Sequence, residues 1–90
     1  MQKNLQAEVW SQTNCPACLE AKNLLKSKGF AVQEKQIGLN SQYTKKDLID
    51  KVPNARTIPQ IFVGDEYIGG LPELKRYLLK NDNNKTTKVV

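Results

Sequence analysis

The sequence predicts an α/β fold in which a four-stranded mixed sheet is flanked by three helices, in the order β-α-β-α-β-β-α. Apolar residues recur with alternating strand and helix periods along most of the chain. A strand, a helix and a second strand follow one another near the start, which implies a parallel pair with a right-handed crossover. Two short apolar runs separated by Gly64-Asp65 predict an antiparallel hairpin. The 90 residues suffice for one small domain.

The first half of the chain reads as strand, helix, strand. Period-two apolar positions predict a strand over residues 5–10, ending at Trp10, whose expected role is core packing. A helix is predicted from Pro16, with Gly29 as its cap. Its apolar face consists of Ala17, Ala21, Leu24 and Leu25. Residues 30–37 form a weaker strand pattern.

The second half adds a helix, the hairpin and a last helix. Thr44 and Asp47 form a helix-start pattern, and Pro53 ends that helix. Its buried face is predicted to consist of Leu48, Ile49 and Val52. The runs QIFV and EYI are the hairpin strands. After Gly69-Gly70, the spacing of Leu71, Leu74 and Leu78 predicts a final helix with Pro72 at its first position.

Composition limits the classes of function. The net charge is +5, but all basic residues except Arg56 and Arg76 are lysines scattered along the chain, so a nucleic-acid surface is not expected. We expect no membrane span, no secretory signal and therefore a cytoplasmic protein, a monomer by default. The polar residues 81–90 are expected to be a disordered tail behind a domain of residues 1–80.

Both cysteines of the chain lie in Cys15-Pro16-Ala17-Cys18, where the first strand gives way to the first helix. With Cys15 as N-cap, the free N–H groups of the first turn and the helix dipole stabilise a thiolate, which lowers the pKa of Cys15. Cys18 lies one turn deeper and attacks second. The placement therefore predicts a redox pair with Cys15 as the nucleophile.

The alternatives to a redox pair are a structural zinc site and two inert core cysteines. A closed structural zinc site needs four ligands, and a chain with two cysteines and no histidine does not supply them, so no metal is expected. Two inert core cysteines are possible, because free cysteine is often buried. A buried pair would need neither the strand-to-helix junction nor the intervening proline.

Three features make the sequence resemble a glutaredoxin, a member of the thioredoxin-fold superfamily. They are the segment VWSQTNCPACLEAKNLLKSKG, the segment RTIPQIFVGDEYIGG and the spacing between them. The resemblance covers residues 5–80. It implies a thioredoxin-like fold and glutathione-dependent reduction of protein disulfides and glutathione mixed disulfides through Cys15 and Cys18.

The resemblance also implies a glutathione site. It implies a cis bond before Pro59, leaving the Ile58 backbone to pair with the cysteinyl part of the ligand, and a backbone approach to the γ-glutamyl carboxylate at Gly69 and Gly70. Arg56 is the candidate for the second carboxylate. The full set of candidate residues is Gln12, Arg56, Thr57, Ile58, Pro59, Gly69, Gly70, Leu71 and Glu73.

The sequence departs from the family pattern at several of these positions. Gln12 stands where many members have lysine, and Ala17 where tyrosine is common. After the double glycine, Leu71-Pro72-Glu73 replaces Cys-Asp-Asp, and Glu73 is the candidate to contact the amino group of the ligand. These changes predict weaker or altered glutathione binding.

Two alternative functions remain open at this stage. One is a thioredoxin-like electron carrier reduced by a flavoprotein reductase, which the changes at Gln12 and Leu71-Pro72 favour. The other is an iron–sulfur carrier with a cluster shared through Cys15 and glutathione, which Pro16 disfavours. Expected partners are glutathione and disulfide-containing or glutathionylated proteins, among which ribonucleotide reductase is a familiar recipient for the family.

Overall fold

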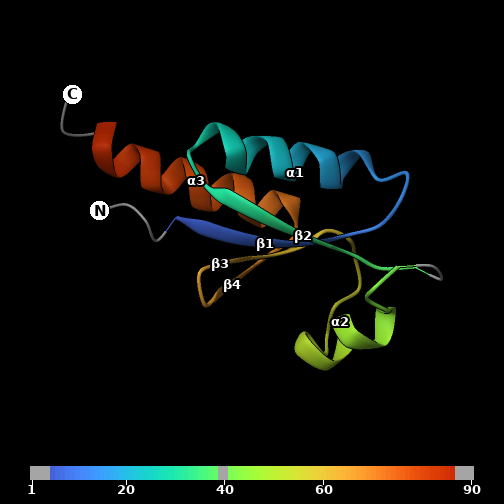
Figure 1. Ribbon diagram of the computed structural model, residues 1–90. Coiled ribbons are helices and arrows are strands. Elements are labelled where there is room, and N and C mark those ends of the chain that lie inside the picture. The colour runs from blue at the N-terminus through green and yellow to red at the C-terminus, as the bar shows by residue number, and fades with distance from the viewer. Residues whose placement is uncertain (1–4, 39–40, 87–90) are drawn as a thin grey trace.

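The computed structural model of the protein describes residues 5–38 and 41–86, and its centre is a four-stranded sheet (Figure 1). The strands are β1 (Gln6–Ser11), β2 (Ala31–Gln36), β3 (Gln60–Val63) and β4 (Glu66–Gly69). Their order across the sheet is β2-β1-β3-β4. The β1–β2 pair is parallel, whereas β3 is antiparallel to both β1 and β4. The predicted mixed sheet, crossover and hairpin are confirmed.

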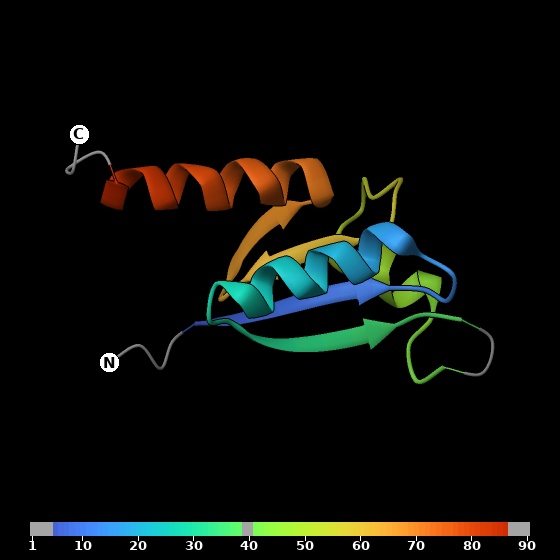
Figure 2. The ribbon, with the colours of Figure 1, turned by 90° about the horizontal axis from the view of Figure 1, so that it is seen from above.

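Three helices cover the two faces of this sheet. They are α1 (Pro16–Ser27), α2 (Lys45–Lys51) and α3 (Leu71–Thr86). Figures 1 and 2 show α1 and α3 side by side on one face and α2 on the other. The predicted order β-α-β-α-β-β-α is therefore confirmed.

Local sequence signals explain where these elements begin and end. The backbone N–H of Asp47 donates to Thr44 Oγ1 at 3.2 Å and the Thr44 N–H donates to Asp47 Oδ2 at 2.9 Å, a capping box that starts α2. Gly29 follows α1 with a φ of +89°, which glycine adopts without steric cost. Gly64 at the β3–β4 turn has a φ of +61°, as two-residue hairpin turns require.

The alternation of side chains along β1 divides the hydrophobic core in two. Ala7 and Val9 face α1 and α3, where they pack with Leu25, Ile61 and Leu74. Trp10 faces the other side, and its cluster contains Ile37, Leu48, Val52 and Phe62. Trp10 is 3% exposed, so its predicted role in core packing is confirmed.

The last helix differs from its prediction at the start. It begins at Leu71, so Pro72 is its second residue and not its first. Proline is tolerated there because the first N–H groups of a helix have no partner within it. At the other end α3 continues to Thr86, within the segment for which we predict disorder, and no proline or glycine interrupts it. Residues 87–90 lie outside the described residues, and the division of the chain at residue 80 stays a prediction.

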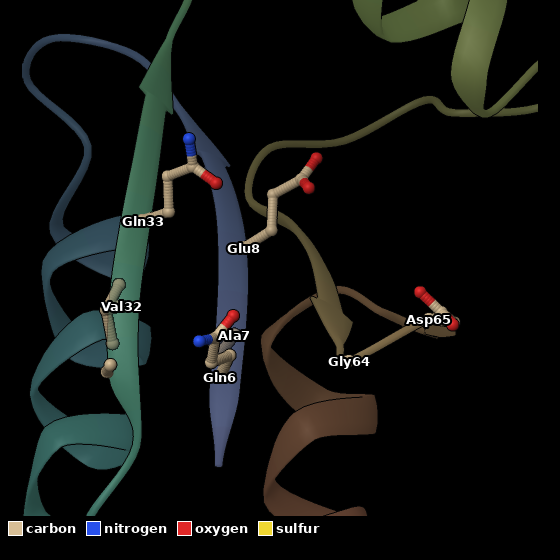
Figure 3. A pocket seen from close by; sticks show the side chains of 8 residues that line it. Gln6, Ala7, Glu8, Val32, Gln33, Gly64 and Asp65 are labelled. Carbon is tan, nitrogen blue, oxygen red and sulfur yellow. The ribbon is translucent and has the colours of Figure 1, made fainter. Parts of the chain in front are cut away.

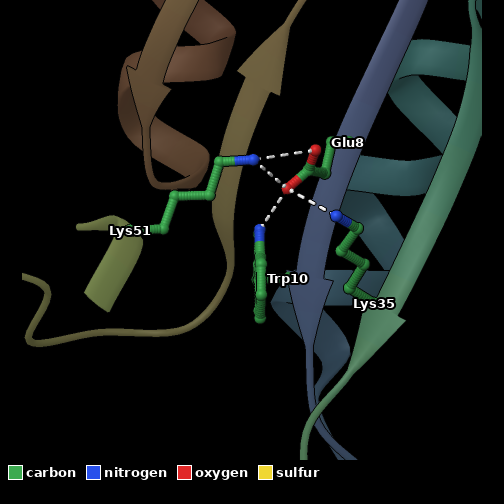
Figure 4. Close-up of polar contacts among 4 residues, drawn as sticks. All are labelled: Glu8, Trp10, Lys35 and Lys51. Atoms are coloured by element: carbon green, nitrogen blue, oxygen red, sulfur yellow. Dashed lines mark hydrogen bonds and ion pairs between the residues drawn. The ribbon is translucent and has the colours of Figure 1, made fainter. Parts of the chain in front are cut away.

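Glu8 joins three elements through one carboxylate (Figure 4). It accepts hydrogen bonds from Lys51 Nζ at 3.0 and 3.2 Å and from the indole N–H of Trp10. Lys35 Nζ lies 3.4 Å from the same carboxylate. Burial raises the pKa of the Glu8 carboxyl, but these hydrogen bonds and the two lysine charges outweigh burial and leave the pKa below its ordinary value of 4.5.

We expect Glu8→Gln to lower the free energy of unfolding at pH 7 by about 1 kcal/mol. Because the folded state holds the pKa of Glu8 below 4.5, the unfolded state binds the proton more readily. The advantage of the wild type is therefore present at neutral pH and disappears as the pH falls below 4.5 and through the folded-state pKa. Urea unfolding at neutral and at acid pH, followed by the fluorescence of Trp10, the single tryptophan, measures the free energy of unfolding under both conditions.

Asp50→Asn is the matched control, because Asp50 forms an exposed pair with Lys46. It should change the free energy of unfolding by less than about 0.5 kcal/mol at either pH. An equal loss in both variants, or a Glu8→Gln loss that persists at about pH 3, would contradict a specific role for the Glu8 carboxylate.

Within the residues that the structure describes, no helix combines the length and the apolar character that crossing a membrane requires.

Candidate active site

The two cysteines lie at the junction between β1 and α1, as the sequence predicts. Cys15 is the N-cap of α1 and Pro16 is the first helical residue. The Cys18 N–H donates to Cys15 Sγ at 3.1 Å, and the two sulfurs form a disulfide with a Cα–Cα distance of 5.2 Å. An N–H directed at a cysteine sulfur at the start of a helix is the arrangement that favours a thiolate when such a cysteine is reduced.

The two cysteines differ in how far they are exposed to solvent. Cys15 is half-buried, whereas Cys18 is 2% exposed and lies on the core side of α1. Cys15 is therefore the more accessible of the two residues. Cys18 is held within one turn of it, at disulfide-bonding distance.

A second part of the site is the loop before β3. The Ile58–Pro59 bond is cis, as the resemblance implies. The buried amide of Gln60 donates to the Thr57 carbonyl at 2.8 Å and to Thr57 Oγ1 at 3.2 Å, while its own oxygen accepts from the Tyr67 hydroxyl. Gln60 thus holds Thr57 in place.

Sequence reasoning missed this role of Gln60. It belongs to the run QIFV, which the sequence indicates only as a hairpin strand. The signal for this role is a polar residue at the start of an apolar strand, because an amide that is buried there needs hydrogen-bond partners.

Tyr67, which donates to Gln60, keeps its proton at neutral pH. Burial raises the pKa of Tyr67, and the charge of Glu73 adds to that effect, so Tyr67 remains a hydrogen-bond donor at neutral pH.

The double glycine lies against this loop. A Cβ on Gly70 would stand 3.4 Å from the Pro59 carbonyl oxygen and 3.7 Å from Thr57 Oγ1. Gly69 has a φ of +122°, and a Cβ there would stand 2.9 Å from Glu73 Cγ. The structure thus brings the cis-proline loop, the two glycines and the start of α3 together.

Two of the predicted ligand residues are already engaged within the chain. Glu73 Oε1 accepts the Gly70 N–H at 2.9 Å, so the carboxylate occupies the N-terminus of α3. The Leu71 side chain packs against the core cluster and leaves only its backbone near the site. Arg76 lies 3.7 Å from the Glu73 carboxylate.

Gln12 connects the loop with the cysteines. It lines a hollow of about 340 Å³ together with Arg56, Thr57 and Ile58. It also lines a second hollow, of about 630 Å³, that contains Cys15 and Cys18. The hollow of the cysteines also includes Glu34 and Gln36 of β2, which the sequence does not indicate as site residues because β2 lies far from the cysteines along the chain.

A further hollow, of about 370 Å³, lies away from the cysteines (Figure 3). It is formed at the opposite end of β1, where Gln6 and Ala7 approach Val32, Gly64 and Asp65. In the described parts of the chain, no group of three or more His, Cys, Asp or Glu side chains is placed to hold a metal ion.

Comparison with known proteins identifies the family. The sequence model of the family described as Glutaredoxin matches residues 7–68. Glutaredoxin 3 of Escherichia coli K12 is 39% identical over 67 residues, which cover 74% of this chain and 78% of that protein. This chain belongs to the glutaredoxin family.

Other relatives agree with this assignment. Glutaredoxin 1 of Rickettsia conorii is 35% identical over 66 residues, and the match spans 73% of this chain and 65% of the relative's length. The solved structure of reduced E. coli glutaredoxin superposes with a TM-score of 0.73 at 30% identity, covering 88% of this chain and 99% of the other. The glutaredoxin described here thus has the predicted thioredoxin-like fold.

Proposed function

We propose that this glutaredoxin is a glutathione-dependent thiol–disulfide oxidoreductase that reduces protein disulfides and glutathione mixed disulfides. The observation that carries the proposal is the Cys18 N–H directed at Cys15 Sγ, on a helix start that adjoins the hollow lined by Arg56, Thr57 and Ile58. In this function the protein acts as a monomer in the reducing cytoplasm.

The chemistry is a series of thiol–disulfide exchanges. The Cys15 thiolate attacks one sulfur of the substrate disulfide, a new Cys15–substrate disulfide forms, and the other sulfur leaves as a thiolate that takes a proton. The Cys18 thiolate then attacks the Cys15 sulfur, which forms the Cys15–Cys18 disulfide and releases the remaining substrate thiol, and two glutathione thiols reduce this disulfide by two further exchanges. Where Cys15 carries glutathione, one free glutathione thiolate can instead attack the glutathione sulfur and release Cys15, and on both routes glutathione supplies the two electrons and ends as its own disulfide.

The glutathione site that we propose follows the cis-proline loop. The Ile58 backbone pairs with the cysteinyl part of the ligand, beside Pro59. Thr57, fixed by Gln60, shapes the loop, and the charge of Arg56 attracts one ligand carboxylate. The backbone around Gly69, Gly70 and Leu71 receives the other carboxylate at the N-terminus of α3. The Gln12 side chain borders the hollow without adding charge.

A coupled assay tests the proposal. A glutathionylated peptide, glutathione, NADPH and glutathione reductase are combined with the protein, and NADPH consumption is followed. We expect turnover that depends on both the protein and glutathione. Reduction by a thioredoxin reductase with no turnover in the glutathione assay would contradict the proposal and favour the flavoprotein-reduced carrier.

Glu73→Ala is expected to strengthen glutathione binding by roughly fivefold, or about 1 kcal/mol. The Glu73 carboxylate accepts the Gly70 N–H that the ligand carboxylate needs, so its removal frees that donor and removes a repelling charge. The KM for glutathione in the coupled assay measures the effect.

Asp50→Ala controls for the change in net charge, because Asp50 is exposed, pairs with Lys46 on α2 and lines neither the hollow beside Arg56 nor that of the cysteines. Its KM for glutathione should stay close to the wild-type value. If Glu73 instead contacts the ligand's amino group, as the sequence analysis expects, Glu73→Ala will raise the KM, and the opposite sign decides between the two roles.

A further inference from the structure

Two adjoining hollows lie along α1, beginning at the cysteines. The first is the hollow of about 630 Å³ that contains Cys15 and Cys18, and the second is a hollow of about 400 Å³ farther along the helix. Pro16 and Leu19 line both hollows, so the two meet at these residues. We call the two hollows together the α1 groove.

The α1 groove is separate from the side on which we place glutathione. Among their lining residues, the hollow beside Arg56, Thr57 and Ile58 and the hollow of the cysteines share only Gln12. A disulfide under attack at Cys15 has two halves, and the leaving sulfur lies beyond the attacked sulfur, roughly in line with Cys15 Sγ. With the glutathione half on the cis-proline side, the chain that carries the leaving sulfur can extend over the other hollow that contains Cys15, which is the first part of the α1 groove.

Leu19 gives the α1 groove an apolar centre. It lies one helical turn after Cys15, and 56% of its surface is exposed. The other large apolar side chains that are exposed in the described part of the chain are Leu5, Tyr67 and Leu79, and none of these lines a hollow with Cys15. A molecule bound beside Cys15 can therefore bury apolar surface on Leu19, which favours binding in proportion to the area covered.

The charged side chains along the α1 groove are already paired within the chain. Lys22 Nζ lies 2.9 Å from Glu34, whose carboxylate also accepts the Ser11 hydroxyl at 2.6 Å. Glu20 lies 2.9 Å from Lys75 Nζ. The ligand therefore needs no net charge, and the amides of Asn14 and Gln36 can pair with a peptide backbone.

We propose that the α1 groove binds the uncharged peptide segment that flanks the target cysteine of a protein substrate, with an apolar side chain packed on Leu19. This inference rests on the proposed function and adds the substrate class. In the first transfer, the Cys15 thiolate forms a disulfide with the glutathione sulfur, and the peptide sulfur leaves toward the groove as a thiolate and takes a proton. The step consumes one disulfide and one thiol and yields one of each.

Two glutathionylated peptides with blocked termini test the proposal, one with leucine and one with serine on both sides of its cysteine. The ratio of kcat/KM between the leucine and serine peptides should be roughly five to ten in the wild type, given the apolar area that the leucines can cover. In Leu19→Ser the ratio should fall to about one. Leu79→Ser, which alters an exposed leucine of α3 that lies away from the cysteines, should keep the wild-type ratio.

The outcomes separate the two claims. A ratio near one in the wild type, or a ratio that Leu19→Ser leaves unchanged, would overturn the α1 groove as a peptide site while glutathione turnover stands. An equal fall in Leu79→Ser would also overturn it, since the effect would then not depend on the groove. Absence of glutathione-coupled turnover of both peptides by the wild type would contradict the proposed function itself, and this inference with it.

Discussion

Cys15→Ser is expected to reduce glutathione-coupled turnover by about a thousandfold or more. In the proposed mechanism the substrate reaches the half-buried Cys15, whose sulfur accepts the Cys18 N–H at the start of α1. A serine hydroxyl at this position stays protonated at neutral pH and does not attack a disulfide. Initial rates with the glutathionylated peptide measure the loss.

Cys18→Ser is the informative control for this variant. Cys18 is 2% exposed, and in the proposed mechanism it acts only after the mixed disulfide has formed, in a step where free glutathione can replace it. We therefore expect Cys18→Ser to retain turnover of glutathione mixed disulfides. Near-wild-type rates in Cys15→Ser, or loss of activity only in Cys18→Ser, would contradict the assignment of Cys15 as the nucleophile.

Leu74→Ala is expected to lower the free energy of unfolding by roughly 3 kcal/mol. Leu74 has no exposed surface and packs with Val9, Leu25 and Ile61, so its truncation leaves a cavity between α3 and the sheet. Its backbone N–H also donates to the Gly70 carbonyl at 3.0 Å, which ties the start of α3 to this packing. Equilibrium denaturation in urea measures the change.

Leu79→Ala provides the comparison, because Leu79 lies on the same helix and is 61% exposed. It should cost less than about 1 kcal/mol. Alanine is at least as good a helix former as leucine, so helix propensity does not account for a loss in either variant. Equal losses in the two variants would contradict the assignment of the effect to the buried contacts of Leu74.

The sequence was sufficient to predict the sheet, the helices and their order because each signal is local. Alternation along residues 5–10 specifies which side chains face each layer, and the caps at Cys15 and Thr44 mark where α1 and α2 begin. The start of α3 was misplaced by one residue, since proline is compatible with both of the first two positions.

The candidate site was only partly predictable. The cysteine motif follows from its placement, whereas the cis bond before Pro59 follows from the family resemblance and not from composition. The Gln60 amide on Thr57 and the Glu73 carboxylate on Gly70 join residues three apart, and they depend on the side-chain conformation that the fold selects. The hollow beside Leu19 depends on how α1 and β2 meet. Such contacts leave no periodic pattern in a single sequence.

The central claim is that glutathione and Cys15 form a mixed disulfide, and trapping it tests that claim most directly. Reduced Cys18→Ser is incubated with glutathione disulfide, and the adduct is located by intact mass and peptide mapping. The account predicts one glutathione on each chain, attached to Cys15 and released by free glutathione. A chain that gains no glutathione while its Cys15 is reduced and accessible to alkylation would contradict it.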